Sequence, residues 1–248
     1  MPEVKYGNLS FDEAIKYFQD KGIEISPNSW KDLWQQASIR GFTVSRVTAM
    51  DVLSDIHTAV DDAVSSGQSL GDFKKGIRDI LEKKGWYAPK GENAELEMPD
   101  GTIRKRLTGW RLDTIYNTNL QTAYSAGRYK QMMETKSREY WQYKAIMDSA
   151  TRPDHAAMND RVWHRDHPIW NTWYPPNGFN CRCYVKTLSE RQMQERGLWE
   201  QKEGMDEQPD EGFRYNVGRT GIDNWQPDLN KYPKTLADQF KQEKPVFD

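Results

Sequence analysis

One stretch, from Asp148 to Cys183, limits what this chain can fold into more than any other segment. It contains three of the four histidines, both cysteines and three of the ten tryptophans of the 248-residue chain. The Pro-Pro-Asn-Gly sequence at residues 175–178 predicts a tight turn, because proline fixes its own φ and both Asn and Gly tolerate a positive φ. This density of aromatic, ligand-forming and turn-forming residues predicts a compact module that is braced by its own side chains.

Extended segments are predicted before this stretch, within it and at its end. Residues 140–147 alternate in an aromatic-rich pattern typical of a strand, and residues 161–163 predict a second, shorter strand. Residues 181–185 predict a further extended run. Thr151 is placed to cap a short helical turn that begins at Pro153, a position where the missing N–H of proline is tolerated. The stretch therefore predicts strands joined by short, sharply turning connections.

These residues resemble the Mu F-like head morphogenesis proteins of tailed bacteriophages, a family of minor head proteins. The family pattern has an aspartate at a strand end, an Arg-Pro-x-His turn and a closing Pro-Pro-x-x-x-x-Cys-Arg-Cys sequence. The corresponding residues here are Asp148, residues 151–155, Met158, residues 161–163 and residues 175–183. A helical lead-in at residues 116–127 is also similar, so the resemblance covers roughly residues 107–196.

The resemblance implies a minor head or capsid protein of a tailed phage or prophage, and not an enzyme. It implies association with the portal protein and other phage head proteins, at the portal or in the head interior. It also implies a part in head morphogenesis, DNA packaging or DNA ejection. We therefore expect the protein in the virion head, after assembly in the host cytoplasm. Other branches of the family carry a Cys-x-x-Cys near the Arg-Pro-x-His position, and this chain has none there.

The composition is typical of a protein that works with partners. Its 35 Lys and Arg against 37 Asp and Glu give a net charge of -2, so no overall basic field attracts it to DNA. Basic runs such as residues 104–106 predict at most a weak, non-specific and salt-dependent contact with phosphates. The mean hydropathy is -0.95 although 12% of residues are aromatic. Aromatic anchors for a partner explain this combination as well as a tryptophan-rich core beside a solvated tail does.

No segment predicts export or a membrane partner. Residues 1–5 lack the apolar core of a signal peptide, and no apolar run approaches the ~20 residues that span a bilayer. The two cysteines are separated by one residue, which argues against a disulfide-stapled secreted scaffold. We therefore expect a protein of a reducing cytoplasm.

Helical periodicity dominates the first half of the chain, and the predicted fold class is α+β. Amphipathic helices are predicted over residues 11–21 with Ser10 as cap, over residues 30–39, from Thr48 onward, from Ser69 to Gly85, and over residues 108–136. The expected organisation is a helical N-terminal region at 1–88, a protruding hairpin at 89–107, the long helix with the β-containing Mu F-like module at 108–197, and an extended C-terminal arm at 198–248.

The hairpin and the arm have a polar composition. Asp100-Gly101 is a strong hairpin signal, and the segment after Trp199 has only scattered apolar residues. Neither segment carries enough apolar residues for a core of its own. We expect both to be mobile in the isolated protein and ordered in an assembled head.

Seven residues form the candidate site: Asp148, Arg152, His155, Asn177, Cys181, Arg182 and Cys183. Four of them are expected to form one buried, hydrogen-bonded brace, namely Asp148, Arg152, His155 and Arg182. In that brace Arg182 pairs with Asp148 or with Asp154.

A zinc site is an open alternative within the same stretch. The candidate ligands are Cys181, Cys183, His155 and His164, because cysteine and histidine are the mixture that zinc prefers. The favoured expectation is no cofactor, because Cys-x-Cys is a poorer signal than Cys-x-x-Cys. The two cysteines are then small buried residues.

An alternative function is a metal- or His-dependent hydrolase, similar to a nuclease. It would use Asp148, His155 and Arg182, with His155 as general base and the arginine on a phosphate. A structural hydrogen-bond network is the commoner role of a histidine beside Asp and Arg. The sequence also contains no Gly-x-Ser-x-Gly and no Gly-rich phosphate loop.

Overall fold

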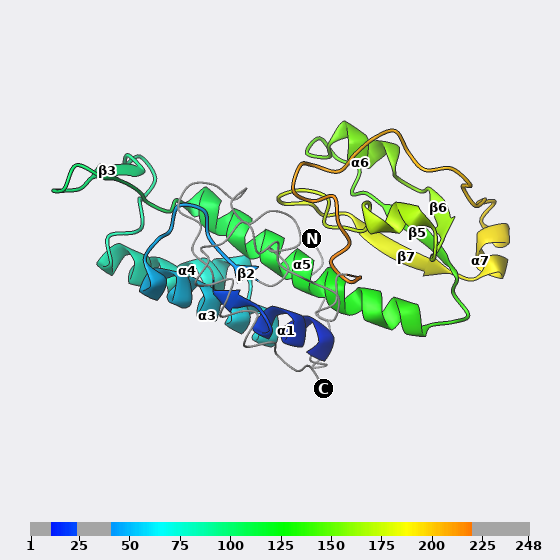
Figure 1. The fold of residues 1–248 in the computed structure, drawn as a ribbon, viewed down its shortest axis with the longest axis horizontal. Coiled ribbons are helices and arrows are strands. Elements are labelled where there is room, and N and C mark those ends of the chain that lie inside the picture. The colour runs from blue at the N-terminus through cyan, green and yellow to red at the C-terminus, as the bar shows by residue number, and fades with distance from the viewer. Residues whose placement is uncertain (1–10, 24–40, 220–248) are drawn as a thin grey trace, which may run out of the picture.

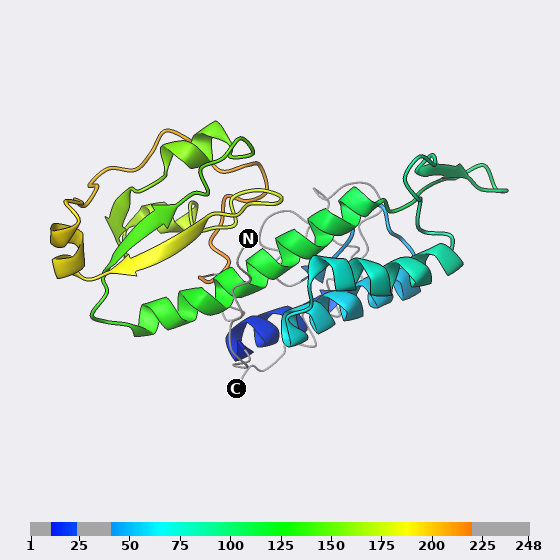
Figure 2. The same ribbon diagram turned by 180° about the vertical axis from the view of Figure 1, so that it is seen from behind.

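A computed structural model describes residues 11–23 and 41–219 of the chain. Figure 1 shows a helical lobe and a β-containing lobe joined by one long helix, α5 (Gly109–Glu134). The fold is α+β, as the sequence predicts. The view from behind in Figure 2 shows the same arrangement, with α5 crossing from one lobe to the other. Among the described residues, no helix combines the length and the apolar character needed to cross a membrane.

The helical lobe packs three described helices against α5, and the first of them reaches the second half of α5 at Gly127. They are α1 (Asp12–Gln19), α3 (Met50–Ser66) and α4 (Leu70–Lys83), and a short parallel pair, β1 (Gly22–Ile23) with β2 (Gly41–Phe42), lies beside them. His57 of α3 stacks on Phe18, with ring centroids 5.0 Å apart, and burial lowers the pKa of its imidazole. His57 is therefore part of this core. The helix predicted over residues 30–39 lies outside the described residues.

The helix predicted from Ser69 is confirmed, with Ser69 as its cap. The Ser69 hydroxyl accepts from the Asp72 N–H at the start of α4. Thr108 caps α5 in the same way, by accepting from the Arg111 N–H. These caps satisfy backbone N–H groups that the helix itself leaves without a partner.

The predicted cap at Thr151 is wrong, and the helix predicted to open at Thr48 begins at Met50. The predicted cap Ser10 lies outside the described residues. The cap positions of α1, α3 and α6 (Pro153–Ala157) are occupied by Phe11, Ala49 and Arg152, and none of these makes a side-chain cap bond. Thr151 does not cap α6 because its hydroxyl is already bonded nearby. The Thr151 hydroxyl instead accepts from the Asp148 N–H at 3.3 Å, one turn earlier in the chain.

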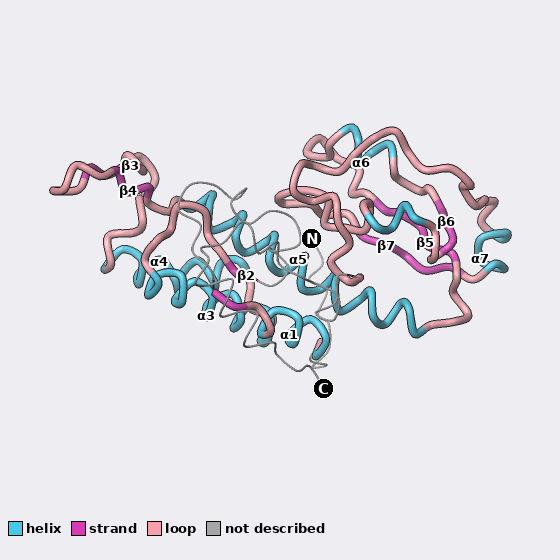
Figure 3. Tube along the Cα trace, viewed as in Figure 1, coloured by secondary structure: helices cyan, strands magenta, loops and turns pink. Residues whose placement is uncertain are grey.

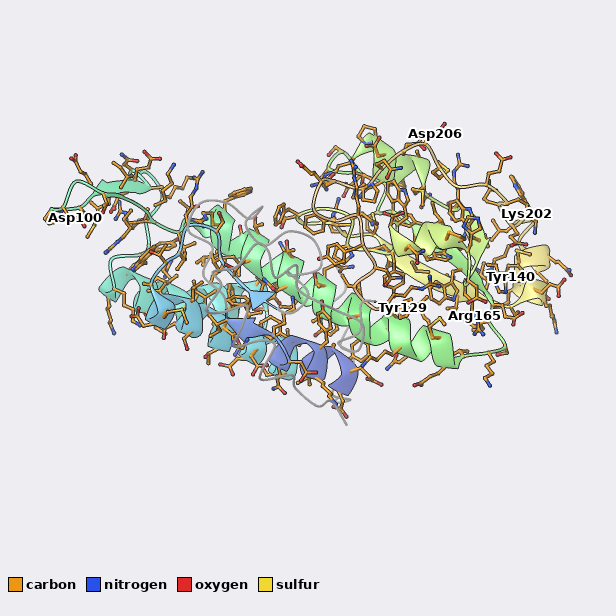
Figure 4. All side chains as sticks on the ribbon, in the orientation of Figure 1. Asp100, Tyr129, Tyr140, Arg165, Lys202 and Asp206 are labelled. Atoms are coloured by element: carbon orange, nitrogen blue, oxygen red, sulfur yellow. The ribbon has the colours of Figure 1, made fainter. Side chains whose placement is uncertain are left out.

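The hairpin forms as predicted, from β3 (Glu95–Glu97) and β4 (Ile103–Lys105). Gly101 adopts a φ of 79° in its turn, and Lys105 pairs with Glu95 at 2.6 Å across the strands. Figure 1 shows the hairpin projecting beyond the end of α4, and Figure 4 places Asp100 at its far tip. The hairpin is therefore a protrusion of the helical lobe.

The β-containing lobe, here called the module, is built on a three-stranded antiparallel sheet in the order β6-β5-β7 (Figure 3). The strands are β5 (Tyr140–Lys144), β6 (Val162–His164) and β7 (Tyr184–Leu188). A 3₁₀ helix, η2 (Pro168–Asn171), precedes β7, and α7 (Glu190–Glu195) follows it with a capping box at Ser189. The extended run predicted from 181 begins as a strand only at Tyr184, because residues 181–183 still belong to the loop.

The core of the module is aromatic. Its largest fully buried side chains are Trp141, Trp163, Trp170, Trp173, Tyr143 and Tyr174. The helix α5 supplies Ala126, Tyr129 and Met132 to this core, while Leu112 and Ala123, nearer its start, belong to the core of the helical lobe. Four of the ten tryptophans are thus in this core, and the two lobes share one helix.

The segment at residues 198–219 packs on the module, although the sequence predicts order only on assembly. The indole N–H of Trp163 donates to the Glu203 carbonyl at 2.8 Å, and that of Trp173 donates to the Glu207 carbonyl at 3.1 Å. Figure 1 shows this segment, in orange, running over the module from α7 toward α5. The physical reason is that buried indole N–H groups need acceptors, which backbone carbonyls of this polar segment provide. The rest of the predicted arm lies outside the described residues.

Candidate functional site

The candidate site lies where the chain leaving β5 meets the loop that enters β7. Antiparallel pairing of these strands sets Tyr143 opposite Val185, so the two connecting segments lie together beyond the ends of the strands. Pro153 begins α6, and this short helix carries His155 into the interior of the module, where the side chain is 2% exposed. Side chains from both segments therefore converge at one end of the sheet.

His155 faces both cysteines. Its Nδ1 lies 3.8 Å from Sγ of Cys181 and 3.5 Å from Sγ of Cys183. Both cysteines are buried and neither forms a disulfide. The other ring nitrogen, Nε2, is buried and has no hydrogen-bond partner among the described residues. The imidazole ring packs edge-on against Trp173, with centroids 6.0 Å apart, which fixes its orientation.

The two thiols have opposite shifts in acidity. A hydrogen bond from Cys183, assisted by His155, lowers the pKa of the Cys181 thiol. The same pairing with Cys181, together with burial, raises the pKa of the Cys183 thiol. One negative charge shared by the pair is therefore stabilised, while a second one is opposed.

Asn177 is a fully buried hydrogen-bonding centre. Its Oδ1 accepts from the Tyr143 hydroxyl at 2.9 Å, its Nδ2 donates to the Thr172 carbonyl at 3.3 Å, and its own carbonyl accepts from the Asp210 N–H at 3.0 Å. Burial raises the pKa of Tyr143 far above its usual value, so this hydroxyl keeps its proton as a donor. Asn177 thus joins β5, the loop and the C-terminal segment.

The turn at residues 175–178 forms for a different reason than the one predicted. Neither Asn177 nor Gly178 has a positive φ, whereas Asn180 has one of 56°. The Pro175-Pro176 peptide bond is cis. Gly178 lets the Asp210 carboxylate approach closely, because a Cβ there would displace that side chain.

Arg182 pairs with Asp148 and not with Asp154. Two hydrogen bonds of 2.6 Å join the guanidinium to both carboxylate oxygens. The guanidinium holds the pKa of the Asp148 carboxyl well below its usual range. The two side chains are 47% and 42% exposed, so the pair lies at the surface of the module and not in its interior.

Arg152 makes a separate contact with the C-terminal segment. Its Nε lies 3.1 Å from Asp210, and its Nη2 donates to the Phe179 carbonyl at 2.9 Å. The expected single buried brace is therefore wrong: it divides into the Arg182 pair, the Arg152 pair and the buried His155 cluster. Long arginine side chains keep their charged ends in water, while the short imidazole on the inner face of α6 is enclosed.

The lead-in helix contacts the same loop. Asn180 donates from Nδ2 to the Thr114 hydroxyl at 3.3 Å and accepts at Oδ1 from Asn117 at 3.3 Å. Gln121 donates to the Cys183 carbonyl at 2.9 Å. The helical lead-in and the closing Cys-Arg-Cys segment, which both belong to the sequence resemblance, thus lie in contact. The helix α5 holds the loop that carries both cysteines.

His164 is not part of the cluster. It lies on β6, where its Nδ1 accepts from the Asp166 N–H at 3.3 Å and its ring packs edge-on to Tyr140. Among the described residues, the only group of three histidine, cysteine or carboxylate side chains placed to share an ion is His155, Cys181 and Cys183, whose ligand atoms lie within 4.8 Å of one another.

A small cavity of about 20 Å³ opens beside this cluster. Its lining includes both cysteines, His155, Arg152 and Arg182. A cavity needs about 10–15 Å³ to hold one water molecule, so the enclosed part of this one has room for a single water. Chemically, the cluster can hold a metal ion or a shared proton.

Sequence reasoning missed Tyr143 and Asp210 as site residues. Asp210 lies in a polar segment without any motif, so its pairing with Arg152 has no local signal. Gly178 is the one residue that could have indicated the close approach of another group, because a glycine that does not need a positive φ often marks such an approach.

The family model and the curated relatives that match this chain point to the same family. The model of the family described as Phage Mu protein F like protein matches residues 54–186. A protein of Escherichia phage Mu, named "Putative capsid assembly protein F", is 44% identical over 193 residues, which are 75% of this chain and 42% of that protein. The Mu-like prophage FluMu F protein of Haemophilus influenzae is 38% identical over 171 residues, which are 68% of this chain and 40% of that protein.

The chain spans about two fifths of the length of these curated relatives. No solved structure matches it significantly. The matched region begins within α3 and ends within β7, so it contains α5 and all seven residues of the predicted site, both cysteines included, but not Asp210. The chain belongs to the Phage Mu protein F like family.

Proposed function

We propose that this chain is a minor head protein of a tailed phage or prophage, which acts in head morphogenesis at the portal or in the head interior. The observation that supports it most is the family match across all seven residues of the predicted site, together with a relative whose printed name refers to capsid assembly. DNA packaging and DNA ejection are the steps at which a portal-associated protein acts, and the proposal includes them.

The geometry of the site supports a structural role more than a catalytic one. His155 is buried against the two cysteines, whereas Asp148 is held by Arg182 at the surface. A hydrolase that uses these three residues needs them around one substrate, and the enclosed part of the adjoining cavity has room for a single water. The alternative of a nuclease-like enzyme is therefore the weaker proposal.

Exposed apolar side chains mark a surface for protein partners at the hairpin end of the molecule. Ile103 on β4 is 55% exposed, and Trp110 on the first turn of α5 is 69% exposed. Exposed tryptophans are frequent anchors in protein interfaces. We infer that this end contacts the portal or another head protein.

The basic residues of the hairpin support a protein partner better than DNA. Lys105 pairs with Glu95, and Arg106 pairs with Glu92 at 3.2 Å. Arg104 lies over the ring of Trp86, 4.8 Å from its centroid. These charges are already engaged within the chain, so a non-specific contact with phosphates would compete with them.

Deletion of the gene tests the proposal. Removing it from the phage or prophage that encodes the chain should stop head morphogenesis or leave heads without DNA, as seen by electron microscopy of induced lysates. Supplying the wild-type gene in trans should restore filled heads. Normal yields of infectious, filled particles from the deletion would contradict the proposal.

A surface variant refines the test. Trp110→Ala should fold with an unchanged melting temperature but complement poorly, because it removes the anchor at the hairpin end. Trp199→Ala is the matched control, since Trp199 is 71% exposed near α7, in the module. Equal complementation by both variants would place the partner surface elsewhere.

A further inference from the structure

We propose that His155, Cys181 and Cys183 bind one zinc ion, which cross-links α6 to the loop that enters β7. The three ligand atoms come from two segments of the module, and all three side chains are buried. Cysteine thiolate with imidazole is the ligand mixture that zinc prefers in proteins.

The distances between the ligand atoms fit a single tetrahedral ion. With Zn–S near 2.3 Å and Zn–N near 2.0–2.1 Å, tetrahedral angles place a nitrogen and a sulfur ligand about 3.6 Å apart. The observed Nδ1 to Sγ separations are 3.5 Å to Cys183 and 3.8 Å to Cys181. Both sulfurs therefore stand at the spacing of ligands that share one centre.

Hydrogen bonding alone explains this arrangement less well. Nδ1 of an imidazole carries either one lone pair or one N–H, so it can make only one good hydrogen bond in the plane of the ring. Here the same nitrogen faces two sulfur atoms at once. One ion in front of Nδ1 would bind all three atoms, whereas a proton would join only two of them.

Charge balance also favours the ion. Two thiolates and a neutral imidazole around Zn²⁺ carry no net charge, which is the arrangement that costs least in a buried site. The cavity of about 20 Å³ at the cluster leaves room for one water as the fourth ligand.

The ion would have a structural role, because all three ligand side chains are buried inside the module. The loop that carries both cysteines is held otherwise by α5, through Gln121, and by Arg182. Zinc would join this loop directly to α6, because metal binding and folding are coupled when the ligands come from separate segments.

Metal analysis of the purified full chain, produced with zinc in the medium, is the first test. Mass spectrometry of the metals should find close to one zinc per chain. A strong chelator should lower the melting temperature, and added zinc should restore it. The two cysteines are the only thiols in the chain, so a thiol reagent should react with both only after the chelator is added.

Variants test the ligand assignment. Cys183→Ser and His155→Asn should lose the zinc, while His155→Cys should retain it because a thiolate replaces the imidazole. His164→Asn is the matched control, since His164 lies outside the cluster and should keep full zinc content. Loss of zinc in His164→Asn with retention in His155→Asn would overturn the assignment.

A cobalt titration decides the question even where a variant fails to fold. Folded wild-type protein freed of metal should take up one Co²⁺ and develop cobalt–thiolate charge-transfer absorption, which zinc then displaces. A wild-type chain that melts cooperatively without metal, takes up neither ion and does not respond to the chelator would overturn the proposal. Stoichiometric iron or copper in place of zinc would overturn it as well.

Discussion

Single residues of the candidate site hold the module by three separate contacts. A surface ion pair joins Arg182 to Asp148, a second joins Arg152 to Asp210, and the buried His155 cluster lies between them. Exposed ion pairs contribute modestly because water and salt screen them. The enclosed polar groups matter more, since a buried group that loses its partner stays unsatisfied.

The pair of Asp148 and Arg182 makes a pH prediction. The pKa of Asp148 is lower in the folded protein than in the unfolded chain, so the pair stabilises the fold fully above the unfolded value of about 4. This stability is lost as the pH falls below that value. Asp148→Asn should therefore melt at a lower temperature than the wild type at pH 7, and the difference should shrink between pH 4 and pH 2.

The matched control for this prediction is Asp154→Asn, an exposed carboxyl in the first turn of α6. It should change the melting temperature little at either pH. A constant difference between Asp148→Asn and the wild type from pH 7 to pH 2 would contradict the assignment of the pair.

Local spacing explains which site residues could be predicted. Asp148, His155 and the two cysteines lie in one stretch whose turns and strands can be predicted from the sequence, so these residues were expected to lie close together. The division of the predicted brace into two surface pairs and one buried cluster could not be predicted, because it depends on which side chains reach water. Asp210 was missed because its contact with Arg152 joins distant segments and no local pattern encodes it.

Among the elements, α5 does most to organise the molecule. It lends side chains to both hydrophobic cores, and its small residues let α1 approach closely. At Gly127 a Cβ would lie 2.8 Å from the backbone nitrogen of Ala14. The run of small residues at 123–127 is consistent with such an approach, but nothing in the sequence names α1 as the neighbour.

Gly127→Ala should destabilise the protein by about 1–3 kcal/mol through overpacking, more than the ~1 kcal/mol that alanine gains over glycine in a helix. Denaturant unfolding measures the difference. Gly76→Ala is the matched control: Gly76 lies inside α4 with open space around its Cα, so alanine there should stabilise by about 0.4–1 kcal/mol. Stabilisation by both changes would show that α1 does not pack on α5 as described.

At the scale of the whole molecule, the polar C-terminal segment completes an aromatic module. Phe213 is buried and packs edge-on against Phe179, with ring centroids 4.9 Å apart. Gly218 lies so close to Tyr129 that a Cβ there would overlap the ring and the Cβ of that tyrosine. Composition alone predicted a mobile arm here, because scattered apolar residues give no sign that another part of the chain receives them.

Phe213→Ala should cost about 3 kcal/mol if residues 198–219 pack in solution as they do here. Trp199→Ala, at an exposed aromatic in the same segment, should change stability by no more than about 0.5 kcal/mol. Chemical denaturation with tryptophan fluorescence would compare the two. Equal, negligible effects would mean that the segment does not belong to the core of the module.

The central claim, a minor protein of the phage head, is tested most directly by the protein content of purified particles. Filled heads from the phage or prophage that encodes the chain should be isolated and analysed by quantitative mass spectrometry. The account predicts peptides from the module, residues 140–197, at a low and constant ratio to the major capsid protein. Filled, infectious heads that contain none of these peptides would contradict it.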